Sequence, residues 1–336
     1  MKYKFEDIAF NSTEKKKPVE SDKSHYIGLE HLDSQCLTVN RYGSDVAPIG
    51  EKLIMKKGDV LFGKRRAYQK KVAIAPFDGI FSAHGFVLRP KENVIDKNFF
   101  PFFISSDYFL DKAISISVGS LSPTINWSDL KVLEFELPDF EEQKRLAKIL
   151  WKIENIKSSI KEQIKKSEDL LFNYYSHIYG NMDGNYQSIK SMVEIQNKSE
   201  IKAGDQIPYG KYKFFTSGEK EGYYNSYLLN GQFLILNTGG SMLCQYYNGP
   251  FAYSTDALVI KPKEDLIKFI YYHLLCNQKY YDEKFFRGSG LQHLNKKEFL
   301  SSEIKIPEKN KIIYIVNFMD NISKIIASLN NQKIYL

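Results

Sequence analysis

The sequence has only three cysteines in 336 residues, Cys36, Cys244 and Cys276, and none of them forms a C-x-x-C pair. This wide spacing argues against a disulfide framework and a cysteine-rich zinc site, and it is typical of reduced intracellular thiols. No uninterrupted apolar run approaches the roughly 18 residues of a membrane-spanning helix, and the opening MKYKFEDIAF does not have the pattern of a signal peptide. We therefore expect a soluble, cytoplasmic protein with no membrane partner.

The sequence also lacks the motifs of common catalytic sites. It has no G-x-x-x-x-G-K-[ST] loop for nucleotide phosphates, no glycine-rich cofactor loop of the methyltransferase kind and no Asn-Pro-Pro or Asp-Pro-Pro aromatic tetrapeptide. No His, Cys and carboxylate cluster has the spacing of metal ligands, and no Ser, Cys or His stands in a nucleophile motif. The sequence thus predicts no catalytic residues, no metal and no cofactor.

One long segment, Glu141 to Tyr179, contains neither proline nor glycine. Its apolar residues recur at alternating three- and four-residue steps, which is typical of a coiled-coil helix. Pro138 precedes the segment and Gly180 follows it, so the predicted helix begins after the first and ends before the second. At 1.5 Å per residue it would extend roughly 58 Å.

The C-terminal segment repeats this spacing, so the two segments are expected to pair as antiparallel helices. The second predicted helix, over 308–336, is shorter than the first. The residues expected to pair the helices are Leu146, Ile149, Ile153, Ile156 and Ile160 in the first, continued by Ser167, Leu170 and Tyr174, and Ile315, Met319, Ile322, Ile326 and Leu329 in the second.

An internal repeat relates the two halves of the chain. Gly58 to Lys91 aligns with Gly231 to Lys263 with one residue of difference in length. Gly119 to Pro138 then aligns with Gly288 to Pro307 without a gap. The matched identities at this second offset of 169 are Gly119 with Gly288, Ser120 with Ser289, Asn126 with Asn295, Glu134 with Glu303, and Pro138 with Pro307. The same order of elements at a nearly constant offset indicates a tandem duplication.

The repeat predicts an α+β protein built from two similar mixed α/β domains in tandem, separated by long helices that form an antiparallel coiled coil with pseudo-twofold symmetry. Short β-branched and aromatic segments cut by Gly or Pro predict small sheets, and 98–116 is expected to form one packed helix. The predicted boundaries are 1–140 for the first domain, 141–180 for the long helix, 181–307 for the second domain and 308–336 for the shorter helix.

This layout resembles the specificity subunit of Type I restriction–modification systems. The local marks are LEFELPDFEEQKRL (Leu133 to Leu146), the turn-rich GSLSPTINWSDL, and YKFFTSGEKEGYYNSY (Tyr212 to Tyr227). The second helix start, IPEKNKIIYIV, lacks the Glu-Gln pair of the first, so the resemblance is weaker there.

The resemblance implies a non-catalytic subunit that recognises DNA. Each domain would be a target-recognition domain that reads one half of a bipartite double-stranded DNA site through the major groove, and the helices would fix the unspecified spacing. The helices would also bind two copies of an adenine methyltransferase subunit, and a motor–nuclease subunit would join for restriction. The shorter second helix puts the symmetry of that docking in doubt. The formal net charge of +7 permits a nucleic-acid partner without requiring one.

Candidate DNA contacts fall in three loops. The basic loop of the first domain carries Lys64, Arg65, Arg66, Tyr68, Lys70 and Lys71 with no acidic residue, and Arg and Lys side chains bind guanine edges and phosphates. The equivalent loop of the second domain is uncharged and offers Thr238, Ser241, Gln245 and Tyr246. The third pair of loops offers Ser120, Ser122 and Thr124 in one half, and Arg287, Ser289, Gln292 and His293 in the other.

Simpler interpretations of these residues remain open at this stage. The basic loop could be a solvated hairpin tip, and the serines and asparagines of the third loops could cap helices. His84 is expected to be packed or hydrogen-bonded rather than catalytic. For the whole chain, the alternatives to a DNA specificity subunit are a coiled-coil scaffold that binds protein, and a stand-alone endonuclease with two DNA-reading domains.

Overall fold

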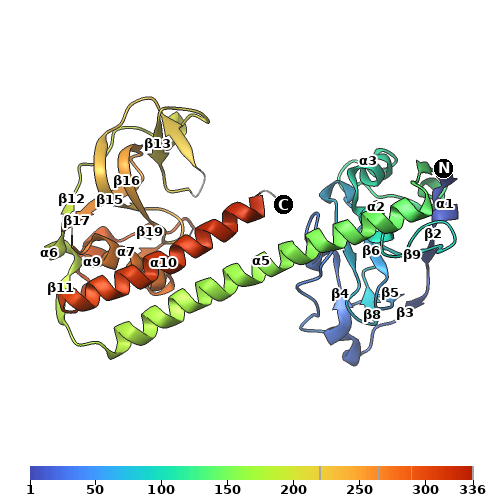
Figure 1. The fold of residues 1–336 in the computed structure, drawn as a ribbon, viewed down its shortest axis with the longest axis horizontal. Coiled ribbons are helices and arrows are strands. Elements are labelled where there is room, and N and C mark those ends of the chain that lie inside the picture. Colours follow the sequence, from blue (N-terminus) through green and yellow to red (C-terminus); the bar gives the residue numbers. More distant parts are fainter. Residues whose placement is uncertain (219–220, 264, 289, 335–336) are drawn as a thin grey trace. The chain divides into compact units, whose positions relative to one another are not determined.

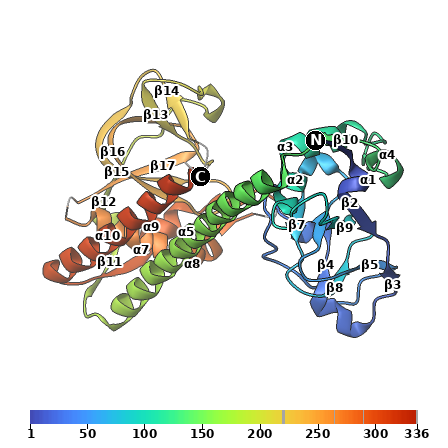
Figure 2. The same ribbon diagram turned by 45° about the vertical axis from the view of Figure 1, so that its right-hand side comes forward.

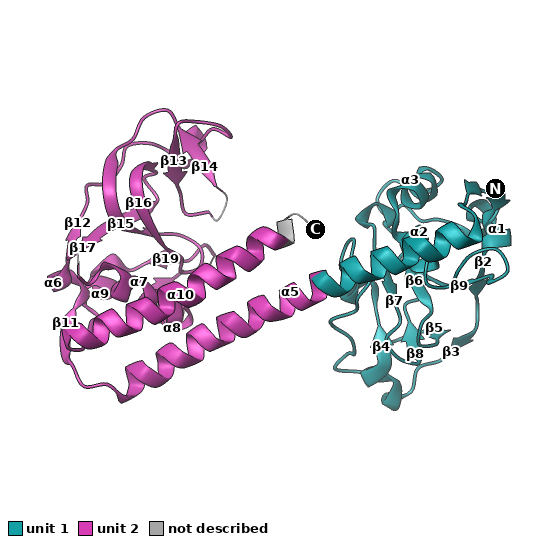
Figure 3. Ribbon diagram, viewed as in Figure 1, with its two compact units in different colours: residues 1–156 teal, residues 157–336 magenta. Residues whose placement is uncertain are grey.

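A computed structural model describes residues 1–218, 221–263, 265–288 and 290–334 of the chain. The chain divides into two compact units, residues 1–156 and 157–336, shown in different colours in Figure 3. Each unit combines helices and sheets around hydrophobic clusters of its own. The predicted class, two mixed α/β domains in tandem, is confirmed.

Unit 1 contains two four-stranded sheets (Figure 1). The first, in the order β2-β9-β6-β7, is antiparallel and consists of Ala9–Ser12, Phe86–Pro90, Val60–Phe62 and Val72–Ile74. The second, in the order β3-β5-β8-β4, consists of Lys15–Lys16, Lys52–Met55, Gly79–Phe81 and Tyr26–Ile27, with β4 parallel to β8. A short antiparallel pair, β1 (Lys2–Lys4) and β10 (Glu134–Glu136), closes the unit.

The helices of unit 1 are short. They are α1 (Phe5–Ile8), α2 (Phe100–Ser105), α3 (Asp107–Ser115) and α4 (Trp127–Leu130), with 3-10 turns at Glu20–His25, Leu29–His31 and Ala67–Gln69. The prediction of one helix over 98–116 is wrong, because the backbone is extended at Ser106. The Ser106 hydroxyl accepts the N–H of Phe109 and caps α3, which favours a new helix start over continuation.

Unit 2 contains one six-stranded sheet in the order β12-β17-β15-β16-β13-β14. These strands are Val193–Ile195, Ala257–Pro262, Leu229–Asn237, Cys244–Tyr253, Tyr212–Phe215 and Gly222–Tyr224. Two short antiparallel pairs accompany it, β11 (Asn185–Ser188) with β20 (Glu303–Ile306), and β18 (Phe286–Arg287) with β19 (His293–Leu294). The helices are α6 (Ile189–Met192), α7 (Ile267–Cys276), α8 (Gln278–Phe285) and α9 (Lys296–Ser301), with a 3-10 turn at Ala203–Asp205.

The strand orders show the duplication directly. The order β2-β9-β6-β7 of unit 1 corresponds to β12-β17-β15-β16 of unit 2, and β1–β10 corresponds to β11–β20. The aligned glycines also adopt the left-handed conformation in both copies: φ is 109° at Gly119 and 153° at Gly288. A side chain is strained at such angles, so both copies use glycine at this turn.

Helix α5 (Phe140–Asn181) is one continuous helix that belongs to both units. Its start is fixed by Gln143, which is almost fully buried. The Gln143 amide accepts the N–H of Asp96 at 2.8 Å and donates to the carbonyl of Pro138 at 3.0 Å. These contacts explain the glutamine of the Glu-Gln pair in the sequence. At the equivalent start in unit 2 the position is Ile312, which is buried in the core without polar contacts to satisfy.

The predicted end of this helix is wrong by two residues, because α5 continues through Gly180 to Asn181. The Asn181 side chain donates to the carbonyl of His177 at 2.9 Å and holds the last turn. Glycine lowers helix stability by about 1 kcal/mol relative to alanine but does not break a helix in the way proline does.

Helix α10 (Lys309–Ile334) runs antiparallel to the second half of α5 within unit 2 (Figures 1 and 2). The rings of Tyr174 and Phe318 stack with centroids 3.7 Å apart, and Ile315 and Met319 are buried in the same core as α5. The coiled-coil pairing is therefore present here.

The predicted pairing positions on α5 need correction. Leu170 is 48% exposed, whereas Leu171 and Tyr175 are 3% and 1% exposed. The buried face is displaced because α5 packs against α7 and α8 of unit 2 as well as against α10. Two other predicted pairing residues, Ile149 and Ile156, are exposed. Ile160 and Leu329 are buried, as the pairing requires.

By length and composition, one described helix, Lys309–Gln332 within α10, could cross a membrane. It is not an uninterrupted apolar run in the sequence, because Asp320 and Lys324 lie within it. Within unit 2, the Asp320 carboxylate forms an ion pair with Lys268 and accepts a hydrogen bond from Tyr272 at 2.7 Å. Packing in the core of unit 2 buries Ile315 and Met319, whereas Ile313, Tyr314 and Ile325 are exposed.

Candidate nucleic-acid interface

The basic loop of unit 1 is held against two other turns by backbone hydrogen bonds. The N–H of Arg65 donates to the carbonyl of His84 at 3.2 Å, and the N–H of Arg66 donates to the carbonyl of Pro123 at 2.7 Å. Arg66 has φ 54°, in the left-handed region that non-glycine residues rarely adopt. The predicted loops around 64–71 and 119–124 are thus brought together on one surface, with the 82–84 turn between them.

Two cations of this loop are engaged by the protein itself. The Lys70 ammonium lies 2.5 Å from Asp107 and 3.4 Å from Asp111, both on α3. These acids raise the pKa of Lys70. The Lys71 ammonium donates to the carbonyl of Leu29 at 2.7 Å. Both residues were predicted to contact DNA, but their charges already have partners within unit 1.

Among the described residues, the side-chain partners of Arg65 and Arg66 are neutral. The Arg65 guanidinium lies 3.5 Å from Nε2 of His84, and Nε of Arg66 donates to the Ser122 hydroxyl at 3.3 Å. Both arginines therefore retain guanidinium N–H groups for a ligand. Burial, followed by the charge of Arg65, lowers the pKa of His84, which favours a neutral imidazole at pH 7.

The rest of this surface is mixed in polarity. Burial lowers the pKa of Lys64, whose ammonium lies 5.1 Å from the ring centre of Phe86. The Thr124 hydroxyl donates to the carbonyl of Ser122, and Ser120 and Tyr68 are exposed. Leu121 is 91% exposed beside them and was missed from the sequence. The sequence signal for Leu121 was its place between two serines that were predicted to contact DNA.

Unit 2 repeats the same backbone frame. The N–H of Thr238 donates to the carbonyl of Asp256 at 3.0 Å, and the N–H of Gly240 donates to the carbonyl of Gln292 at 3.0 Å. The Gly240 bond corresponds to that of Arg66, because Gly239 and Arg65 form equivalent bridges to the third loop. The Thr238 bond reaches the same neighbouring turn as the Arg65 bond, from one residue earlier. The turns between them also match: the hydroxyl of Ser82 accepts the N–H of His84 at 3.3 Å, and that of Ser254 accepts the N–H of Asp256 at 3.3 Å.

The side chains on this shared frame differ between the units. Arg65 corresponds to Gly239, because these two residues form the equivalent bridges to Thr124 and His293. Lys64 therefore corresponds to Thr238, and His84 corresponds to Asp256. One copy presents guanidinium and imidazole groups, and the other presents a hydroxyl and a carboxylate. The same scaffold therefore carries two different sets of hydrogen-bonding groups.

Asn237 holds the second loop in place and was missed from the sequence. Its side-chain amide donates to the carbonyl of Gly239 at 2.9 Å and also to that of Ser241, while its Oδ1 accepts the N–H of Leu243 at 2.7 Å. Asn237 is buried at the end of β15. An asparagine directly before Thr-Gly-Gly was the signal, since asparagine often closes such turns.

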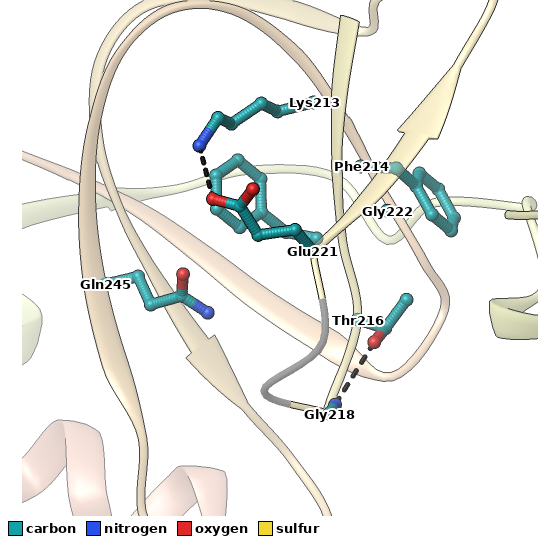
Figure 4. Close-up of a pocket in the computed structure, with 8 residues that line it drawn as sticks. Lys213, Phe214, Thr216, Gly218, Glu221, Gly222 and Gln245 are labelled. Carbon is teal, nitrogen blue, oxygen red and sulfur yellow. Dashed lines mark hydrogen bonds and ion pairs between the residues drawn. The ribbon is translucent and has the colours of Figure 1, made fainter. Parts of the chain in front are cut away.

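The structure separates the other two predicted residues of this loop. Gln245 lines a small pocket beside β13 and β14, together with Thr216 and the ion pair of Lys213 and Glu221, whose atoms lie 2.7 Å apart (Figure 4). Tyr246, the next residue on the strand, packs partly into the core, with its ring 6.0 Å from that of Tyr271. Neither joins the Thr238 turn.

The last predicted loop lies next to the Thr238 turn. His293 forms a bridge with Gly239, and both Gln292 and His293 are exposed. Arg287 forms a two-pronged ion pair with Glu298, at 2.7 Å and 3.3 Å, so its charge is already balanced. Ser289 lies outside the described residues. Among the residues that the structure describes, no group of three or more His, Cys, Asp or Glu side chains could hold a metal ion.

Comparisons with known proteins identify the class to which this fold and surface belong. The family model described as Type I restriction modification DNA specificity domain matches twice, over residues 3–167 and 183–335. The chain therefore belongs to the Type I restriction–modification DNA specificity family. The two matches also agree with the duplication seen in the strand orders.

Particular relatives are distant in sequence. The chain is 23% identical over 166 residues to the Type I restriction enzyme EcoDI specificity subunit of Escherichia coli, covering 49% of this chain and 37% of the relative. It is 25% identical over 222 residues to the putative type I restriction enzyme MjaX specificity subunit of Methanocaldococcus jannaschii, covering 62% and 50%. The matches thus span at most half the length of these two relatives.

Solved structures share the fold along almost the whole chain. The crystal structure of a Type I restriction–modification S subunit from M. genitalium aligns with a TM-score of 0.66 and 14% identity, covering 99% of this chain and 93% of that one. A second structure, from work on complex assembly and conformational transition of the type I R-M system, aligns with a TM-score of 0.56 and 15% identity, covering 100% and 93%.

Proposed function

We propose that this chain is a non-catalytic specificity subunit that reads a bipartite double-stranded DNA target for a Type I restriction–modification complex. The observation that carries the proposal is the frame shared by the Arg65 and Thr238 turns, which presents different polar groups in the two units. A reader of a divided site with two unlike halves needs one docking scaffold used twice with different side chains.

The two surfaces suit different DNA contacts. Arg65 and Arg66 can each pair with guanine or a phosphate through two parallel hydrogen bonds, and Ser122 can contact the backbone. In unit 2, Thr238, Ser241 and Gln292 offer hydroxyl and amide groups, which bind base edges without adding charge. Lys64, Tyr68, Ser120, Thr124 and His293 complete the proposed contact set, and Lys70, Lys71 and Arg287 act first as structural residues.

In this proposal residues 1–140 and 181–307 are the two target-recognition domains. The helices 141–180 and 308–336 connect them, fix the unread spacer between half-sites, and bind the methyltransferase subunits, two copies in the full complex. A motor–nuclease subunit joins when the complex restricts DNA. Both relatives named above are described as restriction-enzyme specificity subunits, which supports this assignment.

The test uses the chain assembled with its methyltransferase subunit and duplex DNA. We expect affinity to fall steeply with salt, because phosphate contacts release counterions, and to depend on the spacer length between half-sites. Scrambling either half-site should weaken binding. If scrambling both halves left binding by the assembled complex unchanged, the proposal would be wrong.

A further inference from the structure

Unit 1 contains an apolar groove of about 520 Å³ whose lining includes none of the residues proposed to contact DNA. It lies between α2, the start of α3, β10 and the first turns of α5. Its lining includes Phe99, Phe102, Phe103, Tyr108, Leu137 and Leu150. Every residue from 1 to 156 is described, and no other element of this unit contributes to the lining.

The duplication shows what covers the equivalent surface in unit 2. With the offset of 169, α2 corresponds to α7 and β10 to β20. There, the second half of α5 lies over α7. The N–H of Lys305 donates to the Tyr179 hydroxyl of that helix at 2.9 Å. In unit 1, the N–H of the equivalent Glu136 donates at 2.9 Å to Tyr108, which belongs to α3 instead.

The covering helix in unit 2 is anchored by apolar and aromatic side chains. Leu171 and Tyr175 are fully buried, and the Tyr175 hydroxyl lies 2.7 Å from Nδ1 of His273. Met319, which corresponds to Leu150 at the offset of 169, is completely buried in that core, whereas Leu150 is only half-buried and lines the open groove. Unit 1 has the receiving surface of this arrangement without a covering helix of its own.

We propose that the groove of unit 1 binds an amphipathic helix of a partner chain. Two differences between the units define the chemistry of that helix. Ile104, which is fully buried and does not line the groove, stands where unit 2 has His273, so a tyrosine at the anchoring position would lack the histidine partner that Tyr175 has. The anchor is therefore phenylalanine or leucine.

The second difference is a reversal of charge. The Lys305 ammonium donates a hydrogen bond to the carbonyl of Met182, just past the end of α5, and lies over the Tyr179 ring. Unit 1 has Glu136 at this position, and Glu136 is exposed at the edge of the groove. A helix that fits unit 1 therefore carries a lysine or arginine where α5 carries Tyr179. This inference depends on the duplication and not on DNA binding.

The test uses the full chain and fluorescein-labelled peptides of residues 168–182, which contain the covering segment. We expect the Y175F/Y179K peptide to bind about tenfold more tightly than the unsubstituted peptide, because it leaves no buried hydroxyl unpaired and pairs with Glu136. Fluorescence anisotropy gives both affinities. L150K in the groove should abolish binding. V132K, at an exposed apolar position outside the lining, should not.

A charge exchange keeps the test valid if L150K fails to fold. E136K should weaken the Y175F/Y179K peptide, and a Y175F/Y179E peptide should recover binding to E136K. Equal affinity of all peptides, or binding unaffected by both L150K and E136K, would overturn the proposal. So would self-association of the chain that L150K abolishes, since the occupant would then be a second copy. If the groove binds a partner helix, neither L150K nor E136K changes DNA binding.

Discussion

Replacing His273 with isoleucine is expected to destabilise unit 2, because two buried tyrosines would lose a hydrogen-bond partner. The ring nitrogens of His273 lie 2.7 Å from the Tyr175 hydroxyl and 3.0 Å from the Tyr281 hydroxyl, and His273 itself is 5% exposed. An unsatisfied buried hydroxyl costs about 1–3 kcal/mol. The Tyr281 hydroxyl retains Ser302 as a neighbour, so the expected loss in the free energy of unfolding is about 2–4 kcal/mol.

Unit 1 has an apolar residue, the buried Ile104, at the position of His273. We therefore expect the triple variant Y175F/H273I/Y281F to regain most of the lost stability, because removing all the polar groups together leaves none unpaired. Non-additivity of this kind is what a shared network produces.

The same histidine gives a pH dependence. Burial lowers the pKa of His273 from 6.5 to about 3. Below pH 6.5 the unfolded chain takes up a proton that the folded chain refuses, so this residue removes stability as the pH falls from 6.5 towards 3. The slope is up to about 1.4 kcal/mol per pH unit. Above pH 6.5 the residue has no such effect, and the triple variant should lack this contribution.

Hydrogen exchange of the α7 amides in urea measures the stability of unit 2 without interference from unit 1. If H273I were as stable as the wild-type chain at pH 7, or the triple variant no more stable than H273I, the network would not have the energetic role assigned to it. A wild-type pH profile in the triple variant would contradict the argument about proton uptake.

Three further predictions concern the DNA surface and the core. The R65A/R66A variant should lose DNA affinity, and the slope of its salt dependence should fall by about one unit for each phosphate contact removed. K70A should change DNA affinity little, because two aspartates already pair with Lys70. Anisotropy titrations over a salt series measure both variants. N237L should destabilise unit 2 by about 2–3 kcal/mol, seen in urea denaturation, because it removes the hydrogen bonds that hold the 238–243 loop. D320A should lower stability by about 1–2 kcal/mol, measured in the same way, because it removes the hydrogen bond from Tyr272 and leaves a half-buried lysine unpaired.

The long helix and the duplication could be predicted from the sequence, because both depend on regularities along the chain. A stretch without proline or glycine and with regular apolar spacing is a sufficient signal for α5. The sequence pattern did not identify which face of α5 is buried. Leu171 and Tyr175 replace Leu170 on it because α7 and α8 also pack against the helix, and those contacts are set by the fold.

The candidate site could be predicted only in part. The positions of the loops followed from the repeat, but the state of each charge did not. Lys70 and Arg66 look alike in the sequence, and only the fold brings Asp107 and Asp111 to Lys70. In the same way, the equivalent bridges of Arg65 and Gly239 equate the two turns more closely than their unlike side chains suggest.

The most direct test of the central claim is methylome sequencing of cells that express this chain with its methyltransferase. The account predicts one modified motif made of two half-sites with an unread spacer. We also expect that exchanging Arg65 and His84 for the glycine and aspartate of the second frame, R65G/H84D, changes the bases of one half-site and leaves the other as it was. A continuous motif, or a change in both halves from this single-unit variant, would contradict it.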